Sequence, residues 1–157
     1  MNLPFKRILC STDFSEPSYA GVEAAISLAK LFDSELFIVH VVSPIPIVPG
    51  SFAPAGSYLP KILEELENSA KTSLQKLVQE RIPVDLSPKT MVTTGTPAME
   101  IVRSAVKIDA DVIVIATHGQ SGWKKFISGS VTERVVRLSD RPVLTIHAPG
   151  KEIEKED

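Results

Sequence analysis

Short runs of aliphatic and β-branched residues alternate along this chain with longer stretches in which apolar positions recur every three or four residues. The short runs are apolar at nearly every position, which is typical of strands buried on both faces of a sheet. The longer stretches have the spacing of one apolar helix face. The pattern predicts five strands, at residues 7–12, 35–42, 89–94, 112–115 and 143–146.

Residue types at the expected helix starts support four helices between these strands. Ser15 can cap a helix with Pro17 in its first turn, and Thr96 can cap one that begins at Pro97. A Ser-x-x-Glu sequence, which can satisfy two N–H groups at a helix start, places a further start at Ser130. The predicted helices cover residues 16–32, 57–81, 97–108 and 130–138.

The alternation of strands and helices predicts an α/β fold. Short buried strands separated by helices form a parallel sheet with helices on both faces. Right-handed crossovers leave a doubly wound, five-stranded sheet as the main candidate. Ligands of such sheets bind beyond the carboxyl ends of the strands, where the strand order reverses. The residues expected to border that crevice are Ser11, Thr12 and Asp13 after the first strand, Val41 and Val42 in the second, and 116–119 after the fourth.

Length and composition fit one globular domain. The chain has 157 residues, of which 43% are hydrophobic, enough for a sizeable core. No apolar run approaches the length of a membrane span, and the first residues lack the apolar region of a signal peptide. Cys10 is the one cysteine and cannot form an internal disulfide, so we expect a cytoplasmic protein with no membrane contact. The expected organisation is one domain over residues 1–148 and a charged, loose tail over 149–157.

The charge pattern argues against a nucleic-acid partner. The net charge is −2, and residues 151–157, with four acidic residues and two lysines, account for all of it. The rest of the chain is neutral and contains one Trp and two Tyr, so we expect no basic, base-stacking surface. One small anionic ligand remains compatible with this composition.

The stretch from Val112 to Ser139 carries the clearest functional motif. Its strand is followed by Ala116-Thr117-His118-Gly119, then by nine residues, Gly129 and the capped helix. Glycines let a backbone approach a ligand closely, and the N–H groups of a helix start favour an anion. The stretch therefore suits a phosphate, although it is neither a Walker A loop nor a dinucleotide fingerprint. His118 has no nucleophile or orienting partner that the sequence identifies, so we predict no catalytic residue.

Two blocks of this sequence resemble the universal stress protein family. The first is Ile8-Leu-Cys-Ser-Thr-Asp-Phe-Ser15, and the second runs from Ala116 through the glycine motif to Leu144. The resemblance covers about residues 4–148 and implies an adenine nucleotide α-hydrolase-like sheet with strand order 3-2-1-4-5. Members that bind ATP carry Gly-x-x-Gly, nine residues and Gly-Ser/Thr. Gly119, Gly129 and Ser130 match that motif, while Ala116 replaces its first glycine.

The resemblance implies a site for ATP, with Mg²⁺ held through the phosphates and no metal ligand from the protein. Asp13 would contact the adenine, and the backbone of Val41 would hydrogen-bond its edge. This agrees with the chemistry, because a carboxylate can accept the adenine amino group and helix-start N–H groups suit phosphate. The implied nucleotide-binding residues are Ser11, Thr12, Asp13, Val41, Ile115, Ala116, Gly119, Gly129, Ser130, Val131 and Thr132.

The resemblance further implies a regulatory, stress-response homodimer with no or very weak ATP hydrolysis. The last strand, Val143–His147, would pair across the dimer axis, which would also cover an open sheet edge. The alternative is a family member that binds no nucleotide and acts only through protein contacts. An α-hydrolase-type enzyme would carry a glycine-rich loop where this chain has residues 11–15, and a response-regulator switch would need acidic pairs there.

Overall fold

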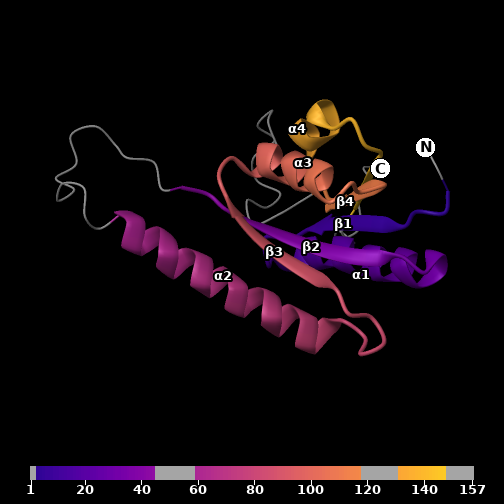
Figure 1. Ribbon diagram of the computed structural model, residues 1–157, viewed down its shortest axis with the longest axis horizontal. Coiled ribbons are helices and arrows are strands. Elements are labelled where there is room, and N and C mark those ends of the chain that lie inside the picture. Colours follow the sequence, from indigo (N-terminus) through magenta and orange to yellow (C-terminus); the bar gives the residue numbers. More distant parts are fainter. Residues whose placement is uncertain (1–2, 45–58, 118–130, 148–157) are drawn as a thin grey trace, which may run out of the picture.

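The computed structural model describes residues 3–44, 59–117 and 131–147, and within these ranges strands and helices alternate as predicted (Figure 1). The predicted helix start at residues 57–58 lies outside the described residues, as does the predicted cap at Ser130. The strands are β1 (Arg7–Ser11), β2 (Glu35–Val42), β3 (Lys89–Thr94), β4 (Val112–Ala116) and β5 (Val143–Ile146). The helices are α1 (Glu16–Phe32), α2 (Leu59–Arg81), α3 (Pro97–Lys107) and α4 (Val131–Leu138).

The sheet is parallel with the order β3-β2-β1-β4-β5, which confirms the predicted fold class and strand order. Two strand ends differ by one residue from the prediction. β1 ends at Ser11 rather than Thr12, and β4 continues to Ala116 because that residue still pairs with Ile146. The described helices include none that is both long and apolar enough to cross a membrane.

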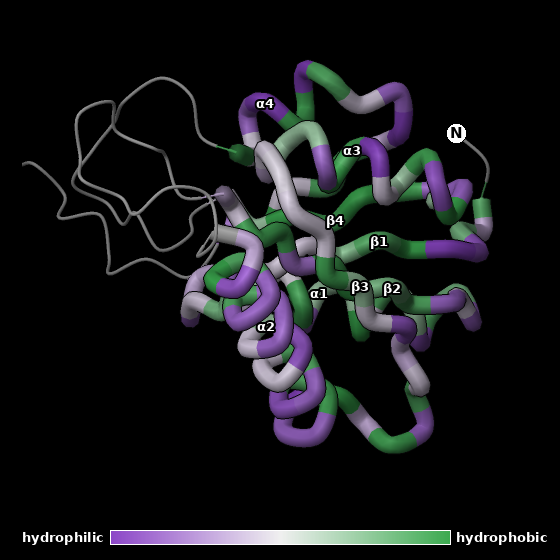
Figure 2. Tube along the Cα trace, turned by 60° about the vertical axis from the view of Figure 1, so that its left-hand side comes forward, coloured by the Kyte–Doolittle hydropathy of each residue, from purple (hydrophilic) through white to green (hydrophobic). Residues whose placement is uncertain are grey.

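Each face of the sheet buries its own apolar core. Figure 1 shows α1 and α2 on one side of the strands and α3 and α4 on the other. Strands β1 and β4 are largely apolar along their length in Figure 2, as central strands covered on both faces must be. The core beneath α1 and α2 includes Ile8, Cys10, Ile38, Leu74 and Val114, and the core beneath α3 and α4 includes Leu9, Val39, Ile101, Ile113 and Val135.

Helix ends are fixed partly as the sequence predicts. Ser15 caps α1, with its hydroxyl oxygen accepting the N–H of Ser18 at 3.3 Å. The helix ends at Asp33, whose φ of 54° is the left-handed conformation that commonly stops a helix. Thr96 occupies the cap position of α3, but its side chain makes no capping hydrogen bond. There the proline at the helix start gives the start signal instead.

Charged residues connect the amino ends of β1, β4 and β5, at the opposite end of the sheet from the carboxyl ends of the strands. The Oδ2 atom of Asp111 accepts the N–H groups of Lys6 at 2.7 Å and Arg7 at 2.8 Å. Asp109 receives Arg7 at 2.7 Å and Arg141 at 3.1 Å. These contacts tie β1 and β5 to the turn that precedes β4.

Replacing Asp111 with Ala is expected to lower the free energy of unfolding by about 1–2 kcal/mol, because two backbone N–H groups lose a charged acceptor and partly exchange it for water. Urea denaturation followed by circular dichroism measures the change. The matched control is Asp111→Asn, which retains an oxygen acceptor and is expected to lose less. Equal losses in the two variants would contradict the role of the accepting oxygen.

Candidate functional site

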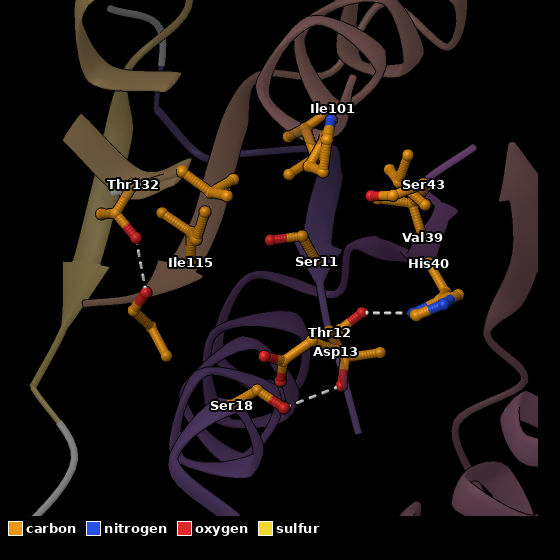
Figure 3. Close-up of a pocket in the computed structure, with 14 residues that line it drawn as sticks. Ser11, Thr12, Asp13, Ser18, Val39, His40, Ser43, Ile101, Ile115 and Thr132 are labelled. Atoms are coloured by element: carbon orange, nitrogen blue, oxygen red, sulfur yellow. Dashed lines mark hydrogen bonds between the residues drawn. The ribbon is translucent and has the colours of Figure 1, made fainter. Parts of the chain in front are cut away.

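A cavity of about 380 Å³ opens beyond the carboxyl ends of β1, β2 and β4 (Figure 3). β1 lies between β2 and β4, where the strand order reverses. The helical connections on the two sides of this point cover opposite faces of the sheet, and a crevice remains between them. The volume falls in the usual range for small-molecule sites. Its lining residues are Ser11, Thr12, Asp13, Ser18, Val39, His40, Val41, Ser43, Pro97, Ile101, Ile115, Ala116, Val131 and Thr132.

Every described residue of the nucleotide-binding set implied by the resemblance lies along this cavity, whereas Val42 and Thr117, also expected to border the crevice, are not among its lining residues. Gly119, Gly129 and Ser130 lie outside the described residues, and so does His118. The expected residues that line the cavity come from β1, β2, β4, the loop after β1 and the first turn of α4. They are Ser11, Thr12, Asp13, Val41, Ile115, Ala116, Val131 and Thr132.

Other lining residues were not singled out as site residues from the sequence. Ser43 directly follows β2 and could have been found by marking every residue next to a strand end, whereas Pro97 lies three residues after the end of β3, at the start of α3. Ser18 lies in the first turn of α1 and carried no signal beyond the helix start. His40 lies in a near-continuous apolar run, a pattern that predicts a core or sheet-end histidine with no catalytic role. The structure places it near the carboxyl end of β2, along the cavity, and adds contacts to the loop after β1.

A directional chain of hydrogen bonds shapes that loop. The N–H of Phe14 donates to Oγ1 of Thr12 at 3.1 Å, and this oxygen lies 2.9 Å from Oγ of Ser18. The Ser18 hydroxyl donates its one hydrogen to the carbonyl of Ser15 at 2.8 Å. Thr12 must therefore be the donor between the two hydroxyls. The chain runs from the loop backbone into the first turn of α1.

Asp13 is the one carboxylate among the described residues that line the cavity. Its Oδ1 atom accepts both the N–H of Ser15 at 3.0 Å and the hydroxyl of Ser15 at 2.5 Å. The same serine caps α1, so the helix start and the carboxylate hold each other in place. A carboxylate has further lone pairs, and a ligand donor can share it.

The backbone of Val41 faces the cavity side of β2. The carbonyl of Val39 accepts the N–H of Thr12 from the β1 side, whereas the carbonyl of Val42 accepts the N–H of Gly95 from the β3 side. Successive residues of a strand direct their backbone groups to opposite sides. Val41 therefore directs its N–H and C=O toward the β1 side, beyond Ser11, the last β1 residue paired with β2.

The other wall of the cavity joins β4 to α4. Oγ1 of Thr132 donates to the carbonyl of Ala116 at 2.7 Å and is buried there (Figure 3). This bond fixes the first turn of α4 against the strand end, with Val131 and Thr132 along the cavity. A helix start presents N–H groups and a positive partial charge, which favour an anion.

Helix α1 approaches this wall closely at Gly21. A Cβ atom at that position would lie 3.2 Å from the backbone nitrogen of Ala116 and 3.7 Å from its Cβ. Even a methyl group at residue 21 would therefore need a shift of a few tenths of an ångström, and a larger side chain would push the helix away from the end of β4. The close approach brings the α1 side of the cavity next to the β4 side.

Cys10 takes no part in the chemistry of the cavity. It is fully buried within β1, and burial raises the pKa of its thiol to about 12. The thiol is therefore protonated and unreactive at neutral pH. The position of Cys10 inside an apolar run of the sequence predicts such a small, buried hydrophobic residue, and the structure confirms it.

Comparison with known sequences identifies the family. The sequence profile described as "Universal stress protein family" matches residues 4–147. This chain belongs to the universal stress protein family. Universal stress protein MJ0531 of Methanocaldococcus jannaschii is 34% identical over 148 residues, which cover 94% of this chain and 85% of that protein. Universal stress protein MJ0577 of the same organism is 30% identical over 157 residues, which cover 93% of this chain and 97% of that protein.

Solved structures agree with this assignment. The structure of protein MJ0577 superposes on this universal stress protein with a TM-score of 0.78 and 27% sequence identity. The superposition covers 93% of this chain and 98% of that chain. The described part of the chain holds no cluster of three or more His, Cys, Asp or Glu residues that could bind a metal ion.

Proposed function

We propose that this universal stress protein binds ATP in the cavity beyond the carboxyl ends of β1, β2 and β4, with Mg²⁺ bound to the phosphates. The observation that carries the proposal is the backbone of Val41, which offers a donor and an acceptor to the cavity beyond the end of β1. The edge of adenine carries a ring nitrogen that accepts and an amino group that donates. Val41 N–H and C=O can satisfy both, as protein backbones can for any ligand with such an edge.

The surroundings of Val41 suit a flat base. Val39, Ile101 and Ile115 supply apolar walls, and Asp13 lies at the polar end of the same cavity. A carboxylate accepts a hydrogen bond from the amino group of adenine, but it would face the carbonyl oxygen that guanine carries at the same ring position. The base preference is therefore for adenine.

The opposite side of the cavity suits phosphate. The start of α4 lies there, and helix-start N–H groups bind anions. No lysine or arginine is among the described lining residues, so a triphosphate needs a cation from solution to neutralise it. Mg²⁺ supplies that charge and is typically bound through phosphates and water rather than by a protein cage. Gly129 and Ser130, from the sequence motif, would complete this side.

Two solved structures with the same fold support an adenine nucleotide as the class of ligand. One universal stress protein was solved in complex with cAMP, with a TM-score of 0.60. Another, from Archaeoglobus fulgidus, was solved in complex with dAMP, with a TM-score of 0.52. At 23% and 19% identity these structures share the fold with this chain, and they demonstrate that the fold can hold such ligands.

The biological role that follows is regulatory. Ser15, whose hydroxyl donates to Asp13, caps α1 and is not a lining residue, and the lining hydroxyls of Ser18 and Thr132 donate to backbone carbonyls rather than to a general base. ATP would thus act as a bound signal with no or very weak hydrolysis. The second candidate, a nucleotide-independent protein that acts only through protein contacts, is favoured by Ala116, whose methyl group stands where ATP-binding relatives have glycine.

The same proposal includes a homodimer formed through β5. This strand ends the sheet, and on it Leu144 is 38% exposed. An apolar strand at a sheet edge is a template for pairing with another strand. Pairing of two β5 strands about a two-fold axis would cover both edges at once.

Titration calorimetry with ATP and Mg²⁺ tests the nucleotide proposal. We expect saturable binding, and we expect Asp13→Ala to weaken it about tenfold or more, because a charge-assisted hydrogen bond to the base is lost. Asp13→Asn is the matched control, since it retains an oxygen acceptor. Wild-type protein that binds no ATP at millimolar concentration would favour the protein-contact alternative.

A further inference from the structure

We propose that His40 is a positioning residue for base recognition: it holds the loop from Thr12 to Ser15 so that Asp13 is presented to the bound base. The inference rests on the proposed function, because it concerns the same cavity. His40 itself needs no contact with the ligand in this proposal. It acts through two contacts with the loop, one polar and one aromatic.

The polar contact fixes the position of one ring hydrogen. Nδ1 of His40 lies 2.9 Å from the carbonyl oxygen of Thr12. Figure 3 marks this hydrogen bond with a dashed line. A carbonyl oxygen can only accept, so Nδ1 must carry the hydrogen. His40 therefore donates to the residue directly before Asp13, which anchors the peptide unit between Thr12 and Asp13.

The aromatic contact lies on the other side of Asp13. The rings of His40 and Phe14 are stacked, with centroids 4.4 Å apart and an interplanar angle of 28°. Phe14 has a φ of 64°, a left-handed conformation that bulky residues adopt only when their surroundings impose it. The stack, together with the N–H bond from Phe14 to Thr12, supplies that restraint.

His40 is itself held on a rigid element. It belongs to β2, where it pairs in register with Val92 of β3, and β2 also pairs with β1. His40 thus contacts Thr12 and Phe14, the residues before and after Asp13, from a strand that is not part of the loop. The consequence is a fixed direction for the Asp13 side chain, whose Oδ1 is further held by Ser15.

Two substitutions separate the two contacts. His40→Phe retains an aromatic ring beside Phe14 but removes the donor to Thr12. His40→Asn removes the ring but places an amide N–H near the position of Nδ1. If the hydrogen bond to the Thr12 carbonyl positions Asp13, His40→Asn should retain most of the loop protection and base preference that His40→Phe loses. Phe14→Leu removes the stack from the loop side and serves as a second variant if His40→Phe does not fold.

The first measurement needs no ligand. Amide hydrogen exchange followed by NMR reports the N–H groups of Phe14 and Ser15, which bond to Thr12 and Asp13. In His40→Phe we expect both amides to exchange about tenfold faster, because local opening of the loop becomes easier. In His40→Asn, which retains a donor to Thr12 and loses only the stack, we expect a smaller increase than in His40→Phe. Unchanged exchange in a folded His40→Phe protein would overturn the proposal.

The second measurement is the ratio of the dissociation constants for GTP and ATP, each with Mg²⁺. We expect His40→Phe to lower this preference for ATP about tenfold and His40→Asn to retain most of it. In an Asp13→Ala background, His40→Phe should change the ratio no further, since both changes act on one interaction. Additive effects, or equal losses for ATP and GTP, would show a general structural role and overturn the proposal.

The two measurements keep this proposal apart from the proposed function. If the wild type binds neither nucleotide, the proposed function fails. Amide exchange then decides alone whether His40 holds the loop. If the wild type prefers ATP and the His40 variants change neither readout, the proposed function stands and the positioning role is wrong.

Discussion

Gly21→Leu is expected to lower the free energy of unfolding by about 3 kcal/mol, the upper part of the usual cost of overpacking a core. The Cβ atom alone would lie 3.2 Å from the nitrogen of Ala116, and that nitrogen belongs to a buried strand paired with β5. The strand cannot yield, so α1 must move away from β4. Because both elements line the cavity, ATP affinity should fall as well. Urea denaturation and calorimetry on the same protein measure the two effects.

Two controls separate packing from helix propensity at position 21. Gly21→Ala gains helix propensity of about 0.5–1 kcal/mol, which the close contact offsets, so its net effect should be small. Ser27→Ala, on the exposed face of α1, gains propensity without a new contact and should be neutral or stabilising. A Gly21→Leu protein as stable as the wild type would mean that α1 is not confined by Ala116.

Thr145→Pro is expected to raise the dissociation constant of the proposed dimer about 30-fold or more, with little effect on the fold of the monomer. The N–H groups of Ile113 and Thr117 donate to the carbonyls of Pro142 and Ile146, so the even-numbered residues of β5 face β4. Thr145 therefore directs its N–H to the free edge. Proline removes that donor, and the two-fold axis doubles the loss.

The matched control for the dimer is Thr145→Ala, which shortens the side chain but retains the N–H. Light scattering over a range of concentrations should show the dimer for wild type and Thr145→Ala, and dissociation for Thr145→Pro. Leu144→Pro is a poorer test, because the N–H of Leu144 faces β4 and its loss would damage the sheet itself. A wild type that is monomeric at micromolar concentration would refute pairing through β5.

The sequence was sufficient for the fold because its signals are local and strong. Continuous apolar runs marked the strands, and Ser15 and Pro97 marked helix starts that the structure confirms. The same reasoning located the cavity, since the residues after strands β1 and β4 must meet at one edge of a parallel sheet. The strand ends erred by one residue because pairing with a neighbour, as between Ala116 and Ile146, decides where a strand stops.

What the sequence could not supply depends on register and on backbone conformation. The direction of the Val41 backbone groups follows from the pairing of Ser11 with Val39, which no local pattern reveals. His40 looked like an ordinary strand residue, because its partner Phe14 reaches it only through a left-handed φ of 64°. Gly21 was not singled out from the sequence, because its neighbour Ala116 is distant in the chain.

Different kinds of contact hold the amino ends and the carboxyl ends of the strands. The two ends therefore respond differently to ionic strength. At the amino ends, Arg7 and Arg141 meet Asp109 in partly exposed ion pairs, which dissolved salt screens. At the carboxyl ends, neutral hydroxyls of Thr12, Ser18 and Thr132 bond to each other or to backbone carbonyls, and the Asp13 carboxylate accepts the N–H and hydroxyl of Ser15. Salt screens these short hydrogen bonds less than exposed ion pairs. Rising salt concentration would therefore loosen the end remote from the cavity while the shape of the cavity persists.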